Sequence, residues 1–296
     1  MKPNIVCFGE TLWDIFPAKK VVGGAPLNVA LRLHSLGANV HIISSIGEDS
    51  EGTNLIRFLD EKKVSTNGIQ RHVNHPTGNV LVHLDKNNTA TYTISEPVAW
   101  DHIYHRQSDT LRISESDAFI FGSLACRNST TRATLLKYIE EATFSVFDAN
   151  LRAPFYQMES IMKFMHQADL IKLNDEELDE IFHFLNVSVK GMKAQIRYLS
   201  SLTKTDHICV TLGSAGALLF TDSMFYRNKG YKVKVEDTVG AGDSFLASLI
   251  YKTLTKVEPQ SALDFSCAMG SIVASKAGAT AMVDNAEIEL LQLLDS

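Results

Sequence analysis

The sequence has 296 residues, of which 45% are hydrophobic and 21% are charged, and a chain of this length and composition can bury the core of one large folded domain. Its 34 acidic and 28 basic residues are spread along the chain and give a formal net charge of -6, so no basic block favours nucleic acid as a partner. No apolar run approaches the roughly 18 residues that span a bilayer, and Glu10 and Asp14 interrupt what would otherwise be a signal-peptide core. We therefore expect a cytoplasmic protein that binds neither nucleic acid nor a membrane.

Short apolar runs alternate with amphipathic stretches through most of the chain. This alternation is typical of a mostly parallel sheet covered by helices on both faces. Buried strands are predicted at residues 5–8, 40–46, 118–121, 144–147, 170–173 and 207–212. Helices are predicted at residues 26–36, 54–63, 130–142, 176–185, 190–202, 241–254, 260–277 and 285–293. The predicted fold class is α/β, a three-layer α/β/α sandwich.

One stretch departs from this pattern, because residues 68–95 alternate apolar and polar side chains with a period of two, which is typical of half-buried strands. Two such runs, 77–84 and 89–94, flank the sequence Asp85-Lys86-Asn87-Asn88, which has the composition of a turn. These runs predict a small antiparallel sheet, which a further strand near residues 12–16 could join. We expect it to be a lid, formed by residues 10–22 and 68–98, on a single domain of residues 1–296.

The run Gly240-Ala241-Gly242-Asp243 directly precedes a predicted helix. Because the first turn of a helix has unpaired N–H groups and a partial positive charge, this turn is a candidate anion hole, and glycine lets the backbone approach a phosphate closely. Asp243 could simply cap the helix. A carboxylate beside an anion site would repel phosphate, however, and a role as general base for an attacking hydroxyl explains its position.

Two segments resemble the signatures of a known family. Residues 237–245, Asp-Thr-Val-Gly-Ala-Gly-Asp-Ser-Phe, resemble the C-terminal signature of the ribokinase-like (PfkB) sugar kinases, and Gly23-Gly24-Ala25-Pro26-Leu27-Asn28 is similar to the N-terminal one. The resemblance implies a ribokinase-like fold, ATP and Mg²⁺ as cofactors, a sugar as substrate, and a homodimer that pairs through the lid. The chain has neither a G-x-G-x-x-G run nor a G-x-x-x-x-G-K-[ST] loop, which disfavours a dinucleotide-dependent oxidoreductase and a Walker-type kinase.

The same resemblance implies roles for individual residues. Sugar hydroxyls would be bound by Asp14, Gly23, Gly24 and Asn28, although Asn28 could equally cap a helix. The sequence Asn174-Asp175-Glu176-Glu177 resembles the family's N-x-x-E element, so Asn174 would lie near the triphosphate and Glu177 would reach Mg²⁺, directly or through water. An acidic first helical turn is the alternative explanation.

Nucleotide and cation contacts are implied by two further segments. Thr211, Gly213 and Gly216 belong to a turn that looks like the family's nucleotide-binding turn, with Thr211 and Gly213 facing the ribose and phosphates. Asp237 stands where many relatives bind a monovalent cation such as K⁺. Met282 stands where those relatives often have a polar residue, so K⁺ dependence is left open.

The substrate is indicated by residues 148–154, which resemble the D-x-N-x-R element of fructokinases and of 2-keto-3-deoxygluconate kinases, and by residues 9–17, which resemble the fructokinase side of that group. Arg152 could pair with a substrate carboxylate or with phosphate oxygens. We expect D-fructose to be phosphorylated on a primary hydroxyl. A kinase for 2-keto-3-deoxygluconate, another keto sugar or ribose is the alternative, followed by a non-catalytic sugar sensor.

Overall fold

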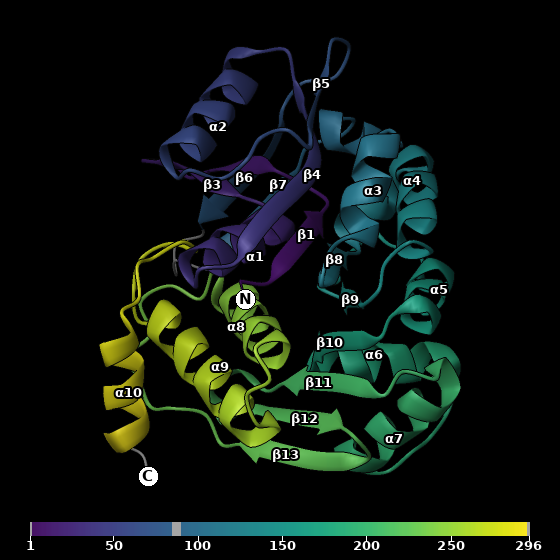
Figure 1. Cartoon of the computed structure of the whole chain (residues 1–296), viewed down its shortest axis with the longest axis vertical. Helices are drawn as coiled ribbons and strands as arrows, with labels where there is room; N and C mark the ends of the chain where they lie inside the picture. The colour runs from purple at the N-terminus through teal and green to yellow at the C-terminus, as the bar shows by residue number, and fades with distance from the viewer. Residues whose placement is uncertain (1, 85–89, 295–296) are drawn as a thin grey trace.

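The computed structural model describes residues 2–84 and 90–294 (Figure 1). Within these residues, nine strands form one large sheet in the order β13-β12-β11-β10-β9-β8-β1-β4-β5. Seven adjacent strands of this sheet, β11, β10, β9, β8, β1, β4 and β5, run parallel to one another. At the β11 edge, β12 and β13 extend the sheet with antiparallel pairing. Their bounds are β1 Asn4–Phe8, β4 Asn39–Gly47, β5 Ile69–His72, β8 Ala118–Gly122, β9 Ser145–Asp148, β10 Leu170–Asn174, β11 His207–Thr211, β12 Ala217–Thr221 and β13 Met224–Asn228.

Helices cover both faces of this sheet, which confirms the predicted three-layer α/β fold. Buried side chains of α3, α4, α5, α6 and α7 share one core cluster, and those of α1, α2, α8 and α9 pack on the other face. The helices are α1 Ala25–Ser35, α2 Ser50–Glu61, α3 Gln107–Ser114, α4 Ser129–Ile139, α5 Met158–Gln167, α6 Asp175–Leu185, α7 Met192–Thr203, α8 Ala241–Leu254, α9 Pro259–Ala274 and α10 Asn285–Leu294. The described part of the chain has no helix with the length and apolar character that crossing a membrane requires.

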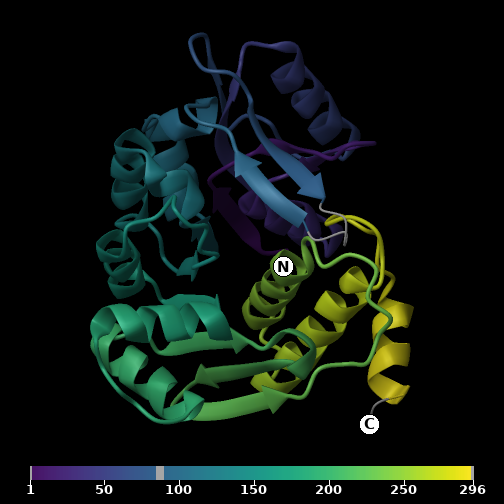
Figure 2. The same ribbon diagram turned by 180° about the vertical axis from the view of Figure 1, so that it is seen from behind.

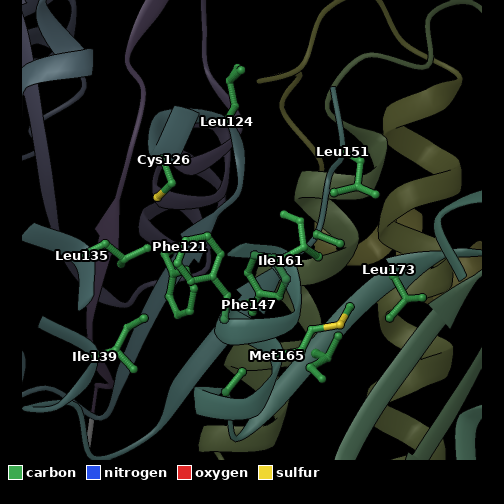
Figure 3. Packing of buried hydrophobic residues seen from close by; sticks show 14 of the residues in the cluster. Phe121, Leu124, Cys126, Leu135, Ile139, Phe147, Leu151, Ile161, Met165 and Leu173 are labelled. Atoms are coloured by element: carbon green, nitrogen blue, oxygen red, sulfur yellow. The ribbon is translucent and has the colours of Figure 1, made fainter. Parts of the chain in front are cut away.

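The strand sequences are apolar on both sides because both faces are covered. Phe121 and Phe147 stack with their ring centroids 5.4 Å apart in the core on the α3 to α7 side (Figure 3). The adjacent residues Ile120 and Val146 point to the opposite face and belong to the cluster that contains α1 and α8. This alternation fixes which side chains of β9 and β10 can meet α8.

The predicted small sheet is present, with the order β3-β2-β6-β7; its strands β6 and β7 come to the front when the molecule is viewed from behind (Figure 2). Its members are β2 Leu12–Ile15, β3 Lys20–Gly23, β6 Gly78–Leu84 and β7 Ala90–Ile94. The strands β6 and β7 pair antiparallel, as predicted, and β2 joins β6 in parallel with Leu12 opposite Gly78. The segment Asp85-Lys86-Asn87-Asn88, for which a turn was predicted, lies outside the described residues.

The extent of the small sheet also differs from the prediction at one strand. We expected all of residues 68–98 in the lid, but Ile69–His72 forms β5 and pairs parallel with β4 at the edge of the large sheet. Ile69 is buried there and packs into the core that contains α1 and α2, which is a stronger constraint than the local alternation of polar residues. The remaining strands of the predicted lid hold Asp14 and Gly23 beside α1.

Candidate active site

Several of the predicted site residues lie where parallel strands of the large sheet end. β9 ends at Asp148, β10 ends at Asn174, and β11 ends at Thr211, which is opposite Asn174 in the strand register. Ligands of open α/β sheets bind outside the carboxyl ends of the strands. The N-terminus of α8 lies at the same edge, next to α1 (Figure 1), so segments from the whole length of the chain meet there.

The first turn of α8 is built without a side-chain cap. Gly240 is the N-cap residue and has a φ of 76°, and a Cβ on it would lie 2.4 Å from Cβ of Ala279, so both the backbone conformation and the packing require glycine. Among the described residues, neither the Gly242 N–H nor the Asp243 N–H has a hydrogen-bond partner. The turn therefore offers donors to an anion, as the sequence predicts.

Asp243 does not cap its own helix. Its Oδ2 accepts a hydrogen bond of 2.8 Å from Nδ2 of Asn28 on α1, a residue 215 positions away in the chain. Asn28 does not cap its helix either, since Gly24 is the N-cap residue of α1. The amide oxygen Oδ1 of Asn28 is buried and finds no partner within residues 2–84 and 90–294. Both capping alternatives are thus replaced by a direct contact between the predicted base and a predicted sugar-binding residue.

The residues predicted to bind the sugar, Asp14, Gly23 and Gly24, lie close together. A Cβ on Gly23 would lie 2.1 Å from Oδ2 of Asp14, and one on Gly24 would lie 2.4 Å from the carbonyl oxygen of Glu10. The Asp14 carboxylate therefore rests against backbone that only glycine provides. Glu10 was not predicted as a site residue, but it is 3% exposed and its Oε2 has no partner among the residues that the structure describes.

Three carboxyl groups of this region are held in their protonated forms to unusually high pH. Burial, followed by the negative charge of Asp148, raises the pKa of Asp243 to about 6. Burial, followed by the charge of Asp243, raises the pKa of Asp14 to about 6, and burial raises the pKa of Glu10 to about 7. The positive charge of Arg152 opposes the rise of the pKa for both Glu10 and Asp243.

The N-x-x-E element at the start of α6 forms a closed capping box. Oδ1 of Asn174 accepts from the Glu177 N–H at 2.8 Å, and Oε2 of Glu177 accepts from the Asn174 N–H at 2.8 Å. Oε1 of Glu177 accepts from the Leu151 N–H at 2.8 Å, which ties α6 to the loop after β9. Both side chains therefore have a structural role in capping α6. Their contacts with triphosphate and metal stay predictions.

A metal would find few protein ligands at this edge. In the part of the chain that the structure describes, no group of three or more His, Cys, Asp or Glu side chains has an arrangement that could hold a metal ion. Mg²⁺ does not need such a cage, because it usually keeps several waters and takes its remaining oxygens from phosphates and one or two carboxylates. The Glu177 carboxylate, with each oxygen bound to one N–H group, fits a contact to Mg²⁺ through water.

The residues predicted to bind nucleotide divide into two kinds. Gly213 has a φ of 55° and is exposed, and no atom lies within 4 Å of the place that a Cβ would take, so the backbone there is open to a ligand. Gly216 is buried, and a Cβ on it would lie 2.2 Å from the carbonyl oxygen of Asn228. The glycine at position 216 is thus required by the packing of β12 against β13, and its contact with nucleotide stays a prediction.

Asp237 accepts two backbone hydrogen bonds just before α8. Its Oδ1 accepts from the Val239 N–H at 3.0 Å and its Oδ2 accepts from the Gly278 N–H at 3.1 Å. These bonds join the turn before α8 to the segment after α9. Met282 is 87% exposed, and the monovalent cation beside Asp237 stays a prediction.

Comparison with known proteins decides the family. The model of the pfkB family carbohydrate kinases matches residues 2–286. The chain belongs to this family. As a pfkB kinase it is a phosphotransferase with an alcohol group as acceptor.

This pfkB kinase is similar to individual relatives in sequence and to solved structures in fold. Fructokinase-2 of Solanum lycopersicum is 30% identical over 321 residues, covering 98% of this chain and 95% of that protein. The structure of Xylella fastidiosa fructokinase with bound ATP has a TM-score of 0.87 at 23% identity and covers 100% of this chain and 99% of that one. The structure of 2-dehydro-3-deoxygluconokinase from Thermotoga maritima has a TM-score of 0.86 at 20% identity and covers 99% of each chain.

Two residues of the candidate site were not predicted from the sequence. Lys172 forms an ion pair with Asp148, its Nζ lying 2.9 Å from Oδ1, and the carbonyl oxygen of Glu10 lies against Gly24. A signal for Lys172 was present, because a lysine in the middle of the apolar run Leu170-Ile171-Lys172-Leu173 is unexpected in a buried strand. Glu10 lies two residues after the end of β1 and gave no comparable signal.

Proposed function

We propose that this kinase transfers the γ-phosphoryl group of ATP to a primary hydroxyl of D-fructose and forms fructose 6-phosphate. The observation that carries the proposal is the position of the Asp243 carboxylate. One of its oxygens bonds to Asn28 on the sugar side, while its own N–H group belongs to the donor turn at the start of α8. A hydroxyl bound beside Asn28 would face both the base and the anion site.

The reaction is an in-line displacement. The bond between the γ-phosphorus and the bridging oxygen of ADP breaks as a bond to the sugar oxygen forms, and Asp243 accepts the hydroxyl proton. The N–H groups of Gly242 and Asp243 stabilise charge on the phosphoryl oxygens. Mg²⁺, when bound with ATP, would neutralise phosphate charge, and Glu177 would hold it through water.

The charge state of Asp243 suits this role. Its pKa of about 6 leaves the carboxylate ionised at neutral pH, while it is a stronger base than an ordinary aspartate. Turnover is therefore expected above about pH 6 and should fall as the carboxyl is protonated. The small sheet formed by β2, β3, β6 and β7 would cover the bound sugar and exclude water, which suppresses hydrolysis of ATP.

Unpartnered polar atoms favour a polyhydroxyl substrate. Oδ1 of Asn28 and Oε2 of Glu10 are buried acceptors that have no hydrogen bond to any described residue, and the Asp14 carboxylate lies over Gly23. Buried acceptors without partners are costly, and sugar hydroxyls would satisfy them. Fructose is preferred because residues 148–154 resemble the fructokinase element and because a relative named fructokinase aligns with nearly the whole chain.

A 2-keto-3-deoxygluconate kinase is the second candidate, and one observation favours it. The exposed Arg152 has a single hydrogen bond, of 3.4 Å from Nη1 to the carbonyl oxygen of Leu151, although its charge acts on Glu10 and Asp243. A guanidinium placed there is suited to a substrate carboxylate. The structure of the Thermotoga maritima enzyme has the same fold.

Turnover of a substrate panel tests the proposal. ADP release is measured with fructose, ribose, 2-keto-3-deoxygluconate and adenosine, and we expect the largest kcat/KM for fructose. Arg152→Gln serves as a matched variant, because it should reduce turnover of the carboxylate-bearing substrate more than that of fructose. A larger kcat/KM for 2-keto-3-deoxygluconate would replace fructose as the substrate, and sugar binding without any ADP release would identify a sensor.

A further inference from the structure

A charged pair lies inside the large sheet, directly below the first turn of α8. Lys172 is the third residue of β10 and is 7% exposed, and Asp148 ends β9 and is 4% exposed. The two residues are register partners in adjacent parallel strands. Ile171 and Leu173 belong to the core on the α3 to α7 side, so Lys172 points to the opposite face, on which α8 packs.

The ammonium group lies close to the turn that offers donors to an anion. A Cβ on Gly242 would lie 3.5 Å from Nζ of Lys172. The positive end of a helix repels a cation, and removing an ammonium group from water is costly. An anion bound at this turn would therefore lie next to the ammonium group of Lys172, which would favour the anion and offset both costs.

The ion pair between Lys172 and Asp148 does not satisfy the hydrogen-bonding groups of either side chain completely. Oδ1 of Asp148 accepts from Nζ at 2.9 Å, while its Oδ2 is buried and has no hydrogen-bond partner in the described part of the chain. On its other side Lys172 is opposite Cys209, a neutral residue. The only hydrogen bond of Nζ within the described residues is the one to Asp148, so further donors of the ammonium group remain for a ligand.

We propose that Lys172, oriented by Asp148, is a catalytic residue that contacts the transferred phosphoryl group at the turn of Gly240, Ala241 and Gly242. The inference rests on the proposed phosphoryl transfer. Lys172 donates hydrogen bonds to phosphoryl oxygens and exchanges no proton, since the proton of the sugar hydroxyl passes to Asp243 and ADP leaves with the bridging oxygen. The cation balances the negative charge that Asp243 brings to the site.

The protonation state of Lys172 agrees with this role. Burial lowers the pKa of Lys172, but the negative charges of Asp148, Glu177 and Asp243 outweigh burial and hold the pKa above its ordinary value. The side chain is therefore an ammonium group at neutral pH, where Asp243 is ionised. It would supply a fixed positive charge in a water-poor site, where such a charge is most effective.

A charge-balanced double variant separates catalysis from structure. Lys172→Met alone leaves Asp148 buried and unpaired and can fail to fold, whereas Asp148→Asn with Lys172→Met removes one charge of each sign and keeps both shapes. We expect this double variant to melt near the wild-type temperature and to bind sugar normally. Its kcat should fall about 10²–10³-fold, as when a single electrostatic donor is removed from an active site.

Binding of phosphate analogues provides a second measurement. The double variant should lose affinity for ADP with aluminium fluoride, a mimic of the transferred group, by about tenfold or more, while its affinity for ADP changes little. Asp148→Asn alone keeps the ammonium group and should keep more activity than the double variant. Lys163→Met, the same substitution at an exposed lysine of α5, should behave as wild type.

Two results would overturn the assignment of Lys172. One is a folded double variant with a kcat close to wild type, and the other is unchanged affinity for the aluminium fluoride complex. A wild-type protein that phosphorylates no sugar would instead contradict the proposed function. In that case the ratio of ATP to ADP affinity still decides whether Lys172 contacts the terminal phosphoryl group, because loss of that contact lowers ATP affinity alone.

Discussion

The helices α6 and α8 both begin at the carboxyl edge of the sheet, yet their first turns are built in opposite ways. α6 satisfies its own donors with the capping box of Asn174 and Glu177. α8 begins at Gly240 without a side-chain cap, and its acidic residue bonds to Asn28 instead. The first turn of α6 is thus stabilised by its own cap, whereas that of α8 leaves donors open, as the roles proposed for this turn and for Asp243 require.

The largest effect is expected from Asp243→Asn at the start of α8. The amide can still accept the hydrogen bond from Asn28 but cannot take a proton from a sugar, so kcat should fall by about 10²–10⁴-fold while sugar affinity is largely kept. A coupled ADP-release assay and sugar titration measure both. Substantial residual turnover would contradict the assignment of Asp243 as base.

The same variant should be more stable than the wild type at neutral pH. The raised pKa of Asp243 means that folding favours its protonated form, so the charged carboxylate destabilises the native state above about pH 6. Neutralising it should raise the free energy of unfolding at pH 7.5 by about 1–3 kcal/mol, measured by urea titration. The gain should disappear near pH 4, where the wild-type carboxyl is protonated; a loss of stability at pH 7.5 would contradict this account.

At α6 the corresponding substitution should act in the opposite direction. Asn174→Ala removes the N-cap and should lower the free energy of unfolding by about 1 kcal/mol. Asn174→Asp retains a capping oxygen and should preserve stability, but its charge should raise the KM for ATP if residue 174 lies beside the triphosphate. An unchanged KM in both variants would show that Asn174 serves the helix alone.

The smallest effect concerns the contact between Asn28 and Asp243. The hydrogen bond from Asn28 stabilises the charged form of Asp243 and lowers its pKa. Because the ionised base is active, Asn28→Leu should move the acid limb of the kcat/KM profile to higher pH, by less than about one unit. A KM increase without this displacement would mean that Asn28 acts on the sugar only.

Much of the fold followed from the sequence because strands covered on both faces are apolar throughout, as at Ala118–Gly122. The strands β12 and β13 and the helices α3 and α5 were not predicted. α3 is short and mostly polar, and Met224 and Arg227 leave β13 with a half-exposed pattern. The parallel pairing of β2 with β6 depends on long-range contacts that no local pattern records.

The candidate site was predictable where a motif is contiguous and not where it depends on packing. The run from Gly240 to Asp243 indicated its chemistry directly. The contact of Asp243 with Asn28, the proximity of Glu10, and the position of Lys172 under Gly242 arise only when distant segments fold together. Lys172 is the clearest case, since its ion pair depends on the strand register that places it opposite Asp148.

The hydrogen bond between Asn28 and Asp243 also has a consequence for the newly made protein. Its two residues are 215 positions apart, and synthesis adds about 5–20 residues per second, so roughly 10–40 s separate the appearance of Asn28 from that of Asp243 on the ribosome. The residues proposed for sugar binding therefore exist long before the proposed base does. With Asp243 as the proposed base, phosphoryl transfer would begin only after α8 has emerged and packed on α1, and unfinished chains would consume no ATP by this route.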